Sequence, residues 1–541
     1  MRTFGRSFAI TFVFAFFTFT FTLQLFSQQK GPLPTKSGLP LPSRGGLPVP
    51  TPSALPSQQL ASQAPRSAAG KQKDSCLIRS SRKVGTTDTI EIGIEGSGNV
   101  IQTLLGSENQ SPSDKMELVA GFCYEERIVE WSPSAASPHL KSIRQYTQAG
   151  MRRNFQGTVT RPLLDISRKN IVVEFDGAEL SSFSPAGPLK NDQYLLISEL
   201  PLNSILLDYF LPNKEVKLGD EWTVPSNVLG PLLGLESVDA NTVRLVLTAI
   251  VDDIAEVDLY LTGDQKDRDG KPIPSTIQGA SLGASVAMDI QGKYQFDLKS
   301  NRMTWFGLTI SEKRSESLAE PGLDWKGTVR IRIAPMEKPS ELTDDKMPEL
   351  NIASTPELLN LTYNGQKGPW KFEHTRDWRM IEDGQDAAAL TFIDKGEGIA
   401  QCNLIWNGKV DLSSMPTLDG YKNELQKGLG EQFGQFVDAS EYDDRQGRRV
   451  MSVVIDGEFD SLPFRRIYYL ITDAQGYQVT VMYDIAADKL DRFGDAGREI
   501  IETIAIIPPP EPSEQSEPSP ASEDKTEETA STESSSEETP N

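Results

Sequence analysis

Histidine is nearly missing from this chain, since only His139 and His374 occur among its 541 residues. Acid–base catalysis near neutral pH and most zinc sites depend on imidazole, so two widely separated histidines leave little material for either. His139 lies in the loop-like stretch SPHLKS and His374 ends an expected edge strand, so both are predicted to be solvated or structural. We therefore expect a protein that is not an enzyme and that carries no cofactor.

Cysteine is also scarce, with three residues and no C-x-x-C pair, which argues against a cysteine metal site. Cys402 lies far from the other two and is expected to be a buried thiol. Cys76 and Cys123 are expected in one domain, and disulfides persist in exported proteins. The sequence therefore predicts a Cys76–Cys123 disulfide.

Basic charge is in deficit, because 54 Lys and Arg face 76 Asp and Glu, for a net charge of -22. Phosphate backbones and anionic membrane surfaces both require a basic face. Nucleic acid is therefore excluded as the expected partner, and an anionic membrane surface is not expected to be the main one. A protein or an apolar ligand remains as the expected partner.

The N-terminus has the three parts of a signal peptide. Arg2 and Arg6 form a basic head, an apolar run extends over residues 8–26, and Ser27 offers a small residue before the cut. We predict that residues 1–27 are a signal peptide and that the protein is exported, periplasmic or secreted. Because a membrane span needs roughly 20 residues, residues 8–26 could instead stay as an anchor, which would be the only membrane contact.

Composition divides the rest of the chain. Residues 28–74 are rich in Pro, Gly and Ser and residues 508–541 are rich in Glu and Ser, so both are predicted to be disordered, one as a linker and one as an acidic tail. Residues 75–335 alternate apolar and polar side chains in short runs, which predicts an antiparallel β-rich domain, either an open barrel or a sandwich. Residues 336–356 form a charged, proline-containing linker with no apolar period to dock, and residues 357–507 predict an α+β sandwich domain.

Three helices are expected from apolar spacing. The stretch ELPLNSILLDYFLP is the one helical candidate of the β-rich part. In the α+β part, MPTLDGYKNELQKGL predicts a helix with one apolar face, and a closing helix is expected over residues 486–503. The runs RRVMSVVIDGEF, PFRRIYYLITD and YQVTVMYDI predict a three-stranded meander between them.

Two stretches of the α+β part, WKFEHTRDWRM and IYYLITDAQGYQVTVMYDIAADKLDRFGDAGREIIETI, resemble the opening strand and the closing hairpin and helix of the PsbP-like family. The resemblance covers about 150 residues, the size of a domain, and implies an α/β/α sandwich. Members of that family are mostly non-enzymatic binding or assembly factors. In the β-rich part, VKLGDEW and DIQGKYQFDLKSNRMTWFGLTISEKR resemble exported domains of unknown function from planctomycete-type bacteria, which implies no activity.

The adjacent carboxylates of VKLGDEWTVP, Asp220 and Glu221, could suggest a catalytic acid pair. Neighbouring side chains of an extended chain point to opposite faces, so these two cannot flank one glycosidic bond. Gly219 and Asp220 instead suit a turn. We therefore interpret this stretch as architecture.

Two further motifs do not support a catalytic serine or a calcium site. GASLG matches the nucleophile pattern around Ser281, but that motif needs a strand, a sharp turn and a helix, and here the following residues continue as strand. DQKDRDGKP resembles a calcium loop but lacks the Asp and the bidentate Glu at its ends, so a hairpin turn is the better interpretation.

The leading hypothesis is an exported, non-catalytic protein with a binding or assembly role in the cell envelope. A hydrolase that uses loop carboxylates, such as Asp252, Asp253, Asp443 and Asp444, is the alternative, and a purely structural envelope component is a third. Exposed aromatics on a sheet are common anchors for a partner. Alternation places Tyr468 and Arg466 together on the less apolar face of their strand, so we expect them to border an interaction surface.

Overall fold

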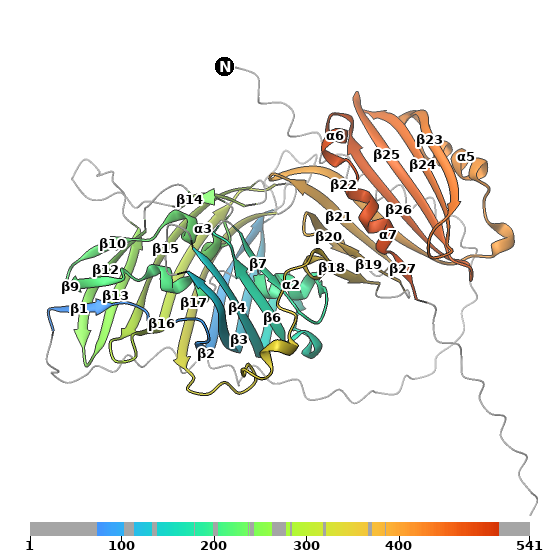
Figure 1. Cartoon of the computed structure of the whole chain (residues 1–541). Helices are drawn as coiled ribbons and strands as arrows, with labels where there is room; N and C mark the ends of the chain where they lie inside the picture. The colour runs from blue at the N-terminus through green and yellow to red at the C-terminus, as the bar shows by residue number, and fades with distance from the viewer. Residues whose placement is uncertain are drawn as a thin grey trace, which may run out of the picture. The chain divides into compact units, whose positions relative to one another are not determined.

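The computed structural model describes residues 73–101, 113–132, 138–177, 179–198, 204–235, 237–238, 243–261, 277–281, 284–317, 321–365, 370–384 and 386–507 (Figure 1). The predicted signal peptide, nearly all of the 28–74 linker, the acidic tail and the stretch DQKDRDGKP lie outside the described residues. Among the helices that are described, none is both long and apolar enough to cross a membrane.

Most of residues 73–335 belong to one fourteen-stranded antiparallel sheet, which confirms the expected β-rich character. Its main path of hydrogen-bonded neighbours runs through β10 (Glu221–Thr223), β12 (Val243–Val251), β13 (Ile254–Leu261), β15 (Ala284–Asp297), β16 (Arg302–Arg314), β17 (Gly322–Pro335), β2 (Thr87–Ile101), β3 (Ser113–Ser132), β4 (His139–Phe155), β6 (Asn170–Phe175) and β7 (Leu180–Phe183). The remaining strands are β5 (Thr158–Thr160), which pairs with β4, and β11 (Ser237–Val238) and β14 (Ile277–Ser281), which join through β15. The path ends at β10 and β7 without returning to its start, so these strands form an open sheet.

The main apolar core lies on one face of this sheet, here called the inner face. Side chains at alternate positions, such as Phe306 and Leu308 on β16, enter the core, as the two-residue period of a strand requires. Three helical segments supply buried side chains to the same core: α2 (Asn191–Ser198), η4 (Ser204–Phe210) and α3 (Ser226–Leu233). A two-stranded sheet of β1 (Ser75–Ile78) and β9 (Lys214–Lys217) adds Cys76, Ile78 and Val216.

The expected helix over ELPLNSILLDYFLP is described only from Ser204 and forms the 3-10 helix η4 rather than an α-helix. The periodic apolar residues still point inward, since Leu206 and Tyr209 are buried. The helix α3 was not predicted from its short sequence, SNVLGPLL.

The opposite face, here called the outer face, is covered over β4, β6 and β7 by the segment that follows β17. Leu342 is 1 % exposed and packs with Ile143, Val172 and Phe183. The Glu125 carboxylate accepts hydrogen bonds from the backbone N–H groups of residues 340–342, at 3.1 to 3.2 Å. The prediction that this segment has nothing to dock is therefore wrong. The segment is held by irregularly spaced apolar residues and by a carboxylate that binds its backbone, so no periodic apolar pattern is needed.

The second large sheet has seven antiparallel strands, β20 (Trp378–Asp383), β21 (Ala387–Asp394), β22 (Glu397–Lys409), β26 (Tyr477–Ala486), β25 (Leu462–Thr472), β24 (Arg449–Phe459) and β23 (Phe433–Asp443). The helix α5 (Leu418–Leu429) packs on one face, and α6 (Leu490–Phe493) and α7 (Ala496–Thr503) pack on the other, because their buried residues belong to two different clusters. Helices therefore cover both faces of this sheet.

The two predicted helices of this part are both present. Helix α5 begins after Thr417, whose side chain accepts a hydrogen bond from the Gly420 N–H, as an N-cap residue does. The closing helix is broken into η8 (Ala487–Lys489), α6 and α7, because the chain turns at Gly494 with a φ of 49°.

A four-stranded sheet joins β27 (Ala505–Ile506), β19 (Trp370–His374), β18 (Leu361–Asn364) and β8 (Leu189–Lys190) in that order. The pairing of β18 with β8 is parallel, and the pattern of the sequence does not predict it. The short helices not yet given are α4 (Pro356–Leu359), η3 (Ile166–Arg168), η5 (Met347–Glu349), η6 (Leu412–Ser414) and η7 (Gly430–Gln432).

All three cysteines are free thiols, so the predicted Cys76–Cys123 disulfide is not formed. Cys76 belongs to the inner core, whereas Cys123 alternates along β3 with Phe122 and Tyr124, which belong to that core. Cys123 therefore points to the outer face, and the sheet lies between the two thiols. Cys402 is buried, and this burial raises the pKa of its thiol, as expected for an inert core cysteine.

Candidate functional site

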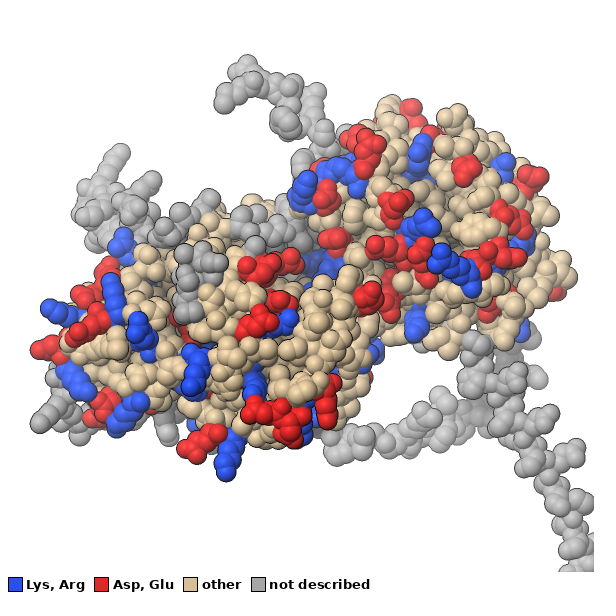
Figure 2. All heavy atoms as spheres, in the orientation of Figure 1, with Lys and Arg blue, Asp and Glu red and all other residues tan. Residues whose placement is uncertain are grey.

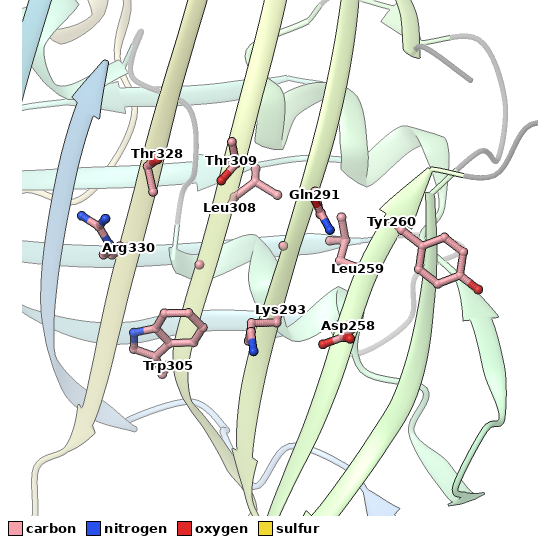
Figure 3. A pocket seen from close by; sticks show the side chains of 12 residues that line it. Asp258, Leu259, Tyr260, Gln291, Lys293, Trp305, Leu308, Thr309, Thr328 and Arg330 are labelled. Carbon is pink, nitrogen blue, oxygen red and sulfur yellow. The ribbon is translucent and has the colours of Figure 1, made fainter. Parts of the chain in front are cut away.

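A shallow groove crosses the outer face of the large sheet over β13, β15, β16 and β17, with a volume of about 580 Å³ (Figure 3). Strand register aligns its side chains in two rows. One row contains Asp258, Lys293, Gly307 and Arg330, and the other contains Tyr260, Gln291, Thr309 and Thr328. The groove is therefore built from strand centres, where each backbone is already paired on both sides.

Trp305 lies flat in this groove. Figure 3 shows its indole broadside, between Arg330 and Lys293. A Cβ atom added to Gly307 would overlap the ring, with the indole carbon Cζ2 only 2.9 Å away. The lack of a side chain at Gly307 thus lets the indole lie against the backbone and turn its other face away from the sheet.

Most polar side chains of the groove have no partner within the described ranges. No hydrogen bond or ion pair joins these groups to any other residue that the structure describes. All of them lie on the groove floor: Asp258, Gln291, Lys293, Thr309, Thr328 and the Trp305 indole N–H. Polar side chains that are not paired within the protein are free to bind water or a ligand. This set is concentrated on four neighbouring strands.

The two sides of the groove are fixed by pairs. The Tyr260 hydroxyl donates to Glu221 at 2.8 Å, and Arg330 donates to Glu95 at 2.7 Å. Arg330 is thereby neutralised, and Lys293 and Asp258 are the remaining charged side chains of the floor, one of each sign, without a partner among the described residues. Acidic and basic side chains are also intermixed on the face of the molecule drawn in Figure 2.

A second hollow, also of about 580 Å³, lies on the outer face beside β3 and β4. Cys123, Thr147 and Glu341 are among its lining residues. Here the polar groups are largely paired: Thr147 donates to the Cys123 carbonyl at 3.1 Å, and Gln145 reaches Glu341 at 3.4 Å. This hollow therefore offers fewer free groups than the groove around Trp305.

A buried network of charges lies on the inner face of the same sheet. Arg82 pairs with Asp88 at 2.7 Å and with Asp208 at 3.6 Å, and Arg144 pairs with Glu126 at 2.8 Å. Burial alone would raise the pKa of Glu126, but Arg144 and Arg82 outweigh burial and hold this pKa below its usual value. Burial keeps the pKa of Asp208 above its usual value despite the Arg82 charge.

Side-chain hydroxyls complete this network. Ser204 at the start of η4 donates to Glu126 at 2.9 Å and lies 2.8 Å from the Tyr124 hydroxyl, and Ser80 donates to Asp208 at 2.7 Å. Shifted pKa values can indicate a functional site, but structural ion-pair networks shift them too. Since these groups pair with one another and neither of the two hollows contains the ion pairs, the network fixes η4 against the sheet.

The structure contradicts the expectation that Tyr468 and Arg466 border an exposed surface. Tyr468 is 8 % exposed and packs with Tyr421 of α5, and Arg466 is 4 % exposed. The Arg466 Nε donates to both carboxylate oxygens of Asp484 at 3.0 Å. Strand alternation did separate these residues correctly from Tyr469, but the expectation assumed one solvated face, whereas helices cover both.

The carboxylates considered from the sequence serve turns and pairs. The Asp220 carboxylate accepts from the Lys217 N–H at 2.8 Å beside Gly219, whose φ is 86°, and this is the turn that was expected. Asp252 and Asp253 form the tight turn between β12 and β13, with φ values of 50° and 65°.

The remaining candidates also lie at hairpins. Asp444 accepts from Arg448 at 2.6 Å in the turn between β23 and β24, next to Asp443. Ser281 ends β14, which pairs with the following strand β15. Within the described ranges, no cluster of three or more His, Cys, Asp or Glu side chains could hold a metal ion.

The groove was not found from the sequence, although a signal for it exists. Polar side chains alternate with apolar ones along QGKYQFDL and RMTWFGLTI, which shows only that both strands have a polar face. The pairing register is what places Gly307 between Lys293 and Arg330. A tryptophan two residues before a glycine on the polar side of a strand was the one local indication.

Comparison with known proteins gives a weak likeness of fold. The cyanobacterial PsbP protein (CyanoP) of Synechocystis sp. PCC 6803 is similar with a TM-score of 0.24 at 13 % identity, over 28 % of this chain and 95 % of CyanoP. The Saccharomyces cerevisiae Ran-binding protein Mog1p is similar with a TM-score of 0.22 at 10 % identity, over 27 % of this chain and 95 % of Mog1p. Lipovitellin is similar with a TM-score of 0.26 at 7 % identity, over 51 % of this chain and 27 % of lipovitellin.

No family model matches the chain, and no curated protein matches it. The expected resemblance of the β-rich part to planctomycete-type exported domains therefore has no support. The likeness to CyanoP and Mog1p supports a PsbP-like fold for part of the chain only weakly, and carries no argument about what the protein does.

Proposed function

We propose that this chain is an exported, non-catalytic binding protein of the cell envelope, and that the groove around Trp305 is its ligand-binding surface. The observation that carries this proposal is the set of polar side chains on four neighbouring strands that have no partner in the described part of the chain, arranged around an indole that lies flat on the sheet. Elsewhere on the same face, the chain covers the sheet with its own segment around Leu342. The groove, in contrast, keeps most of its polar side chains without a partner among the described residues.

The form of the groove favours binding over catalysis. Catalytic carboxylates and lysines act most strongly in sites that exclude water, where their charges interact in a low dielectric. Gln291 and Lys293 are exposed on an open strand surface, so their interactions are screened by solvent. A surface of this kind is suited to hold a ligand through many modest contacts.

We also propose that residues 357–507 have a PsbP-like fold and serve as an interaction module. A seven-stranded antiparallel sheet with α5 on one face and α6 and α7 on the other supports this arrangement. The module's own binding surface does not include Tyr468 and Arg466, which are buried.

The proposal is tested by a binding screen with two matched variants. The whole protein would be screened against immobilised polysaccharides, peptides and lipid vesicles, together with Trp305→Ala and Lys313→Ala. Lys313 is an exposed residue of the same strand, outside the groove. We expect a ligand whose binding is weakened by Trp305→Ala and unchanged by Lys313→Ala. Binding that responds equally to both variants, or to neither, would overturn the groove as the ligand site.

A further inference from the structure

We propose that the groove takes a neutral oligosaccharide, which stacks one sugar ring on Trp305 and crosses β13, β15, β16 and β17. This inference rests on the proposed function, since it names the ligand class of the same groove. It differs from the apolar ligand expected from the sequence, because the leucines that line the groove, Leu259 and Leu308, are buried in the inner core, and most of the other side chains in the lining are polar.

The indole supplies the stacking surface. An aromatic face carries partial negative charge and attracts the polarised C–H groups that form the flat side of a sugar ring. Trp305 is held against Gly307, so one ring face is turned toward the sheet and the other away from it. The platform exists before any ligand binds, which limits the entropy lost on binding.

The neighbouring polar groups match hydroxyls. Thr309 and Thr328 carry hydroxyls and Gln291 carries an amide, so each can both donate and accept a hydrogen bond. Sugar hydroxyls have the same dual character. The row from Tyr260 to Thr328 crosses three gaps between strands, which is roughly 14 Å at about 4.8 Å a gap, longer than a single sugar ring.

The charge of the groove indicates a neutral ligand. Arg330 is paired with Glu95, and the floor then holds Asp258 and Lys293, one charge of each sign. A polyanion would meet Asp258 and a polycation would meet Lys293. Binding without net charge complementarity is expected to depend little on salt.

An extended peptide is a poorer fit. Peptides that join a sheet use the free backbone groups of an edge strand. The strands β13, β15, β16 and β17 each have hydrogen-bonded neighbours on both sides, so the groove offers side chains but no free strand edge.

The test is calorimetric titration of the full chain with neutral oligosaccharides of hexose and N-acetylhexosamine units, three to six units long, chosen from a glycan array. We expect Trp305→Ala to weaken binding about tenfold or more, and Trp305→Tyr to retain most of it, because stacking needs an aromatic face. Raising sodium chloride from low to high concentration should change the affinity less than about twofold.

Gly307 in the groove and Gly93 beyond its edge provide the matched pair. Gly307→Ala places a methyl group where the indole lies and should displace the ring, so binding should fall about as far as in Trp305→Ala. Gly93 lies on β2 directly across from Arg330, and a methyl group there meets no atom within 4 Å. Gly93→Ala should therefore bind like the unchanged protein.

The outcomes separate the ligand class from the site. If neutral oligosaccharides do not bind, while an anionic glycan or a peptide binds and loses affinity in both Trp305→Ala and Gly307→Ala, the ligand class is overturned and the groove stands. If oligosaccharides bind but Gly307→Ala and Gly93→Ala behave alike, the groove itself is overturned. Should Trp305→Ala fail to fold, Gln291→Ala and Thr309→Val, on the groove floor, decide the question by the same titration.

Discussion

Trp305 and Trp325 make the same local contact on opposite faces of one sheet. Each indole occupies the space above a glycine: Trp305 lies over Gly307, and Trp325 lies over Gly327 of its own strand and Gly96 of β2. Trp325 is 8 % exposed and belongs to the inner core, whereas Trp305 lies in the outer groove. A flat indole on a glycine can therefore fill a core or form a binding platform, and its surroundings decide between the two.

The two faces differ most in whether their polar side chains are paired with other side chains. On the inner face, Arg82, Arg144, Asp88, Glu126 and Asp208 are buried and pair with one another. In the outer groove, Tyr260 and Arg330 are paired, and the other polar side chains have no partner among the described residues. The inner polar groups are therefore expected to matter for stability, and the outer ones for binding.

The largest effect is expected from breaking the inner network. Glu126→Ala removes the carboxylate that pairs with the buried Arg144, while Arg82 keeps Asp88 and Asp208. Removing one partner of a buried pair typically costs about 3–5 kcal/mol. Urea unfolding followed by far-UV circular dichroism would measure the loss. The exposed pair Arg498 and Glu502 is the control, and Arg498→Ala should leave the midpoint unchanged. A Glu126→Ala midpoint equal to that of the unchanged protein would contradict a stabilising network.

The two tryptophans test the comparison directly. Trp325→Ala should destabilise the protein by about 3–5 kcal/mol, because it opens a cavity in the core. Trp305→Ala should cost about 1 kcal/mol or less, since its ring loses contact on one side only. The same urea experiment compares both. Equal losses would mean that Trp305 is a core residue and not a platform.

His374 extends the comparison to a buried polar group with an unpaired atom. Its Nδ1 lies 2.8 Å from the Thr375 carbonyl, and its Nε2 has no hydrogen-bond partner among the described residues. Burial lowers the pKa of His374 to about 4, below its usual 6.5, so the unfolded chain binds the extra proton first as the pH falls. Stability should therefore be fully present above pH 6.5 and decline by about 3 kcal/mol as the pH falls to 4.

The contribution of His374 is isolated by comparing pH profiles. His374→Phe keeps an aromatic ring beside Phe372 and removes the titrating group, so its stability should fall less steeply between pH 6.5 and pH 5. Carboxylates add their own loss below pH 5, in both proteins alike. Parallel profiles above pH 5 would show that the pKa of His374 is the same in the folded and the unfolded chain, which would contradict the effect of burial.

The smallest effect is expected from the free charges of the groove. Asp258→Asn and Lys293→Gln should each change the free energy of unfolding by less than about 0.5 kcal/mol, because neither side chain has a partner to lose among the residues that the structure describes. Thermal melting checks this. A loss above 1 kcal/mol would show that these residues hold the sheet together, which would remove the distinction between the two faces.

Much of the fold could be predicted from local pattern. Alternation along β15 and β16 and the turn at Gly219 and Asp220 depend on neighbouring residues, and both are present. The helix α5 is also present, with its cap at Thr417. Features that depend on residues far apart in the sequence were not predicted. Cys76 and Cys123 point to opposite faces and form no disulfide, and α5 buries Tyr468.

The groove and the inner network also could not be predicted from local sequence pattern. Glu126 and Arg144 lie at core-facing positions of β3 and β4, but their pairing follows from the register between the strands. In the sequence, nothing distinguishes Gly307 from the other glycines. Its neighbours Lys293 and Arg330 are set by the pairing of β16 with β15 and β17. A period of two assigns a side chain to a face, and only strand pairing assigns it neighbours.

The hydrogen bonds from the backbone N–H groups of residues 340–342 to Glu125, here called the Glu125 clamp, have a consequence for proteolysis. A protease needs several residues in an extended, accessible form, and the charged, proline-containing stretch after β17 has a composition that usually invites cutting. Here the carboxylate binds the backbone N–H groups of residues 340–342, and Leu342 is buried beneath them. Cutting must wait until this segment lifts from the sheet, so the rate of cleavage between Glu337 and Pro348 measures how often the clamp opens.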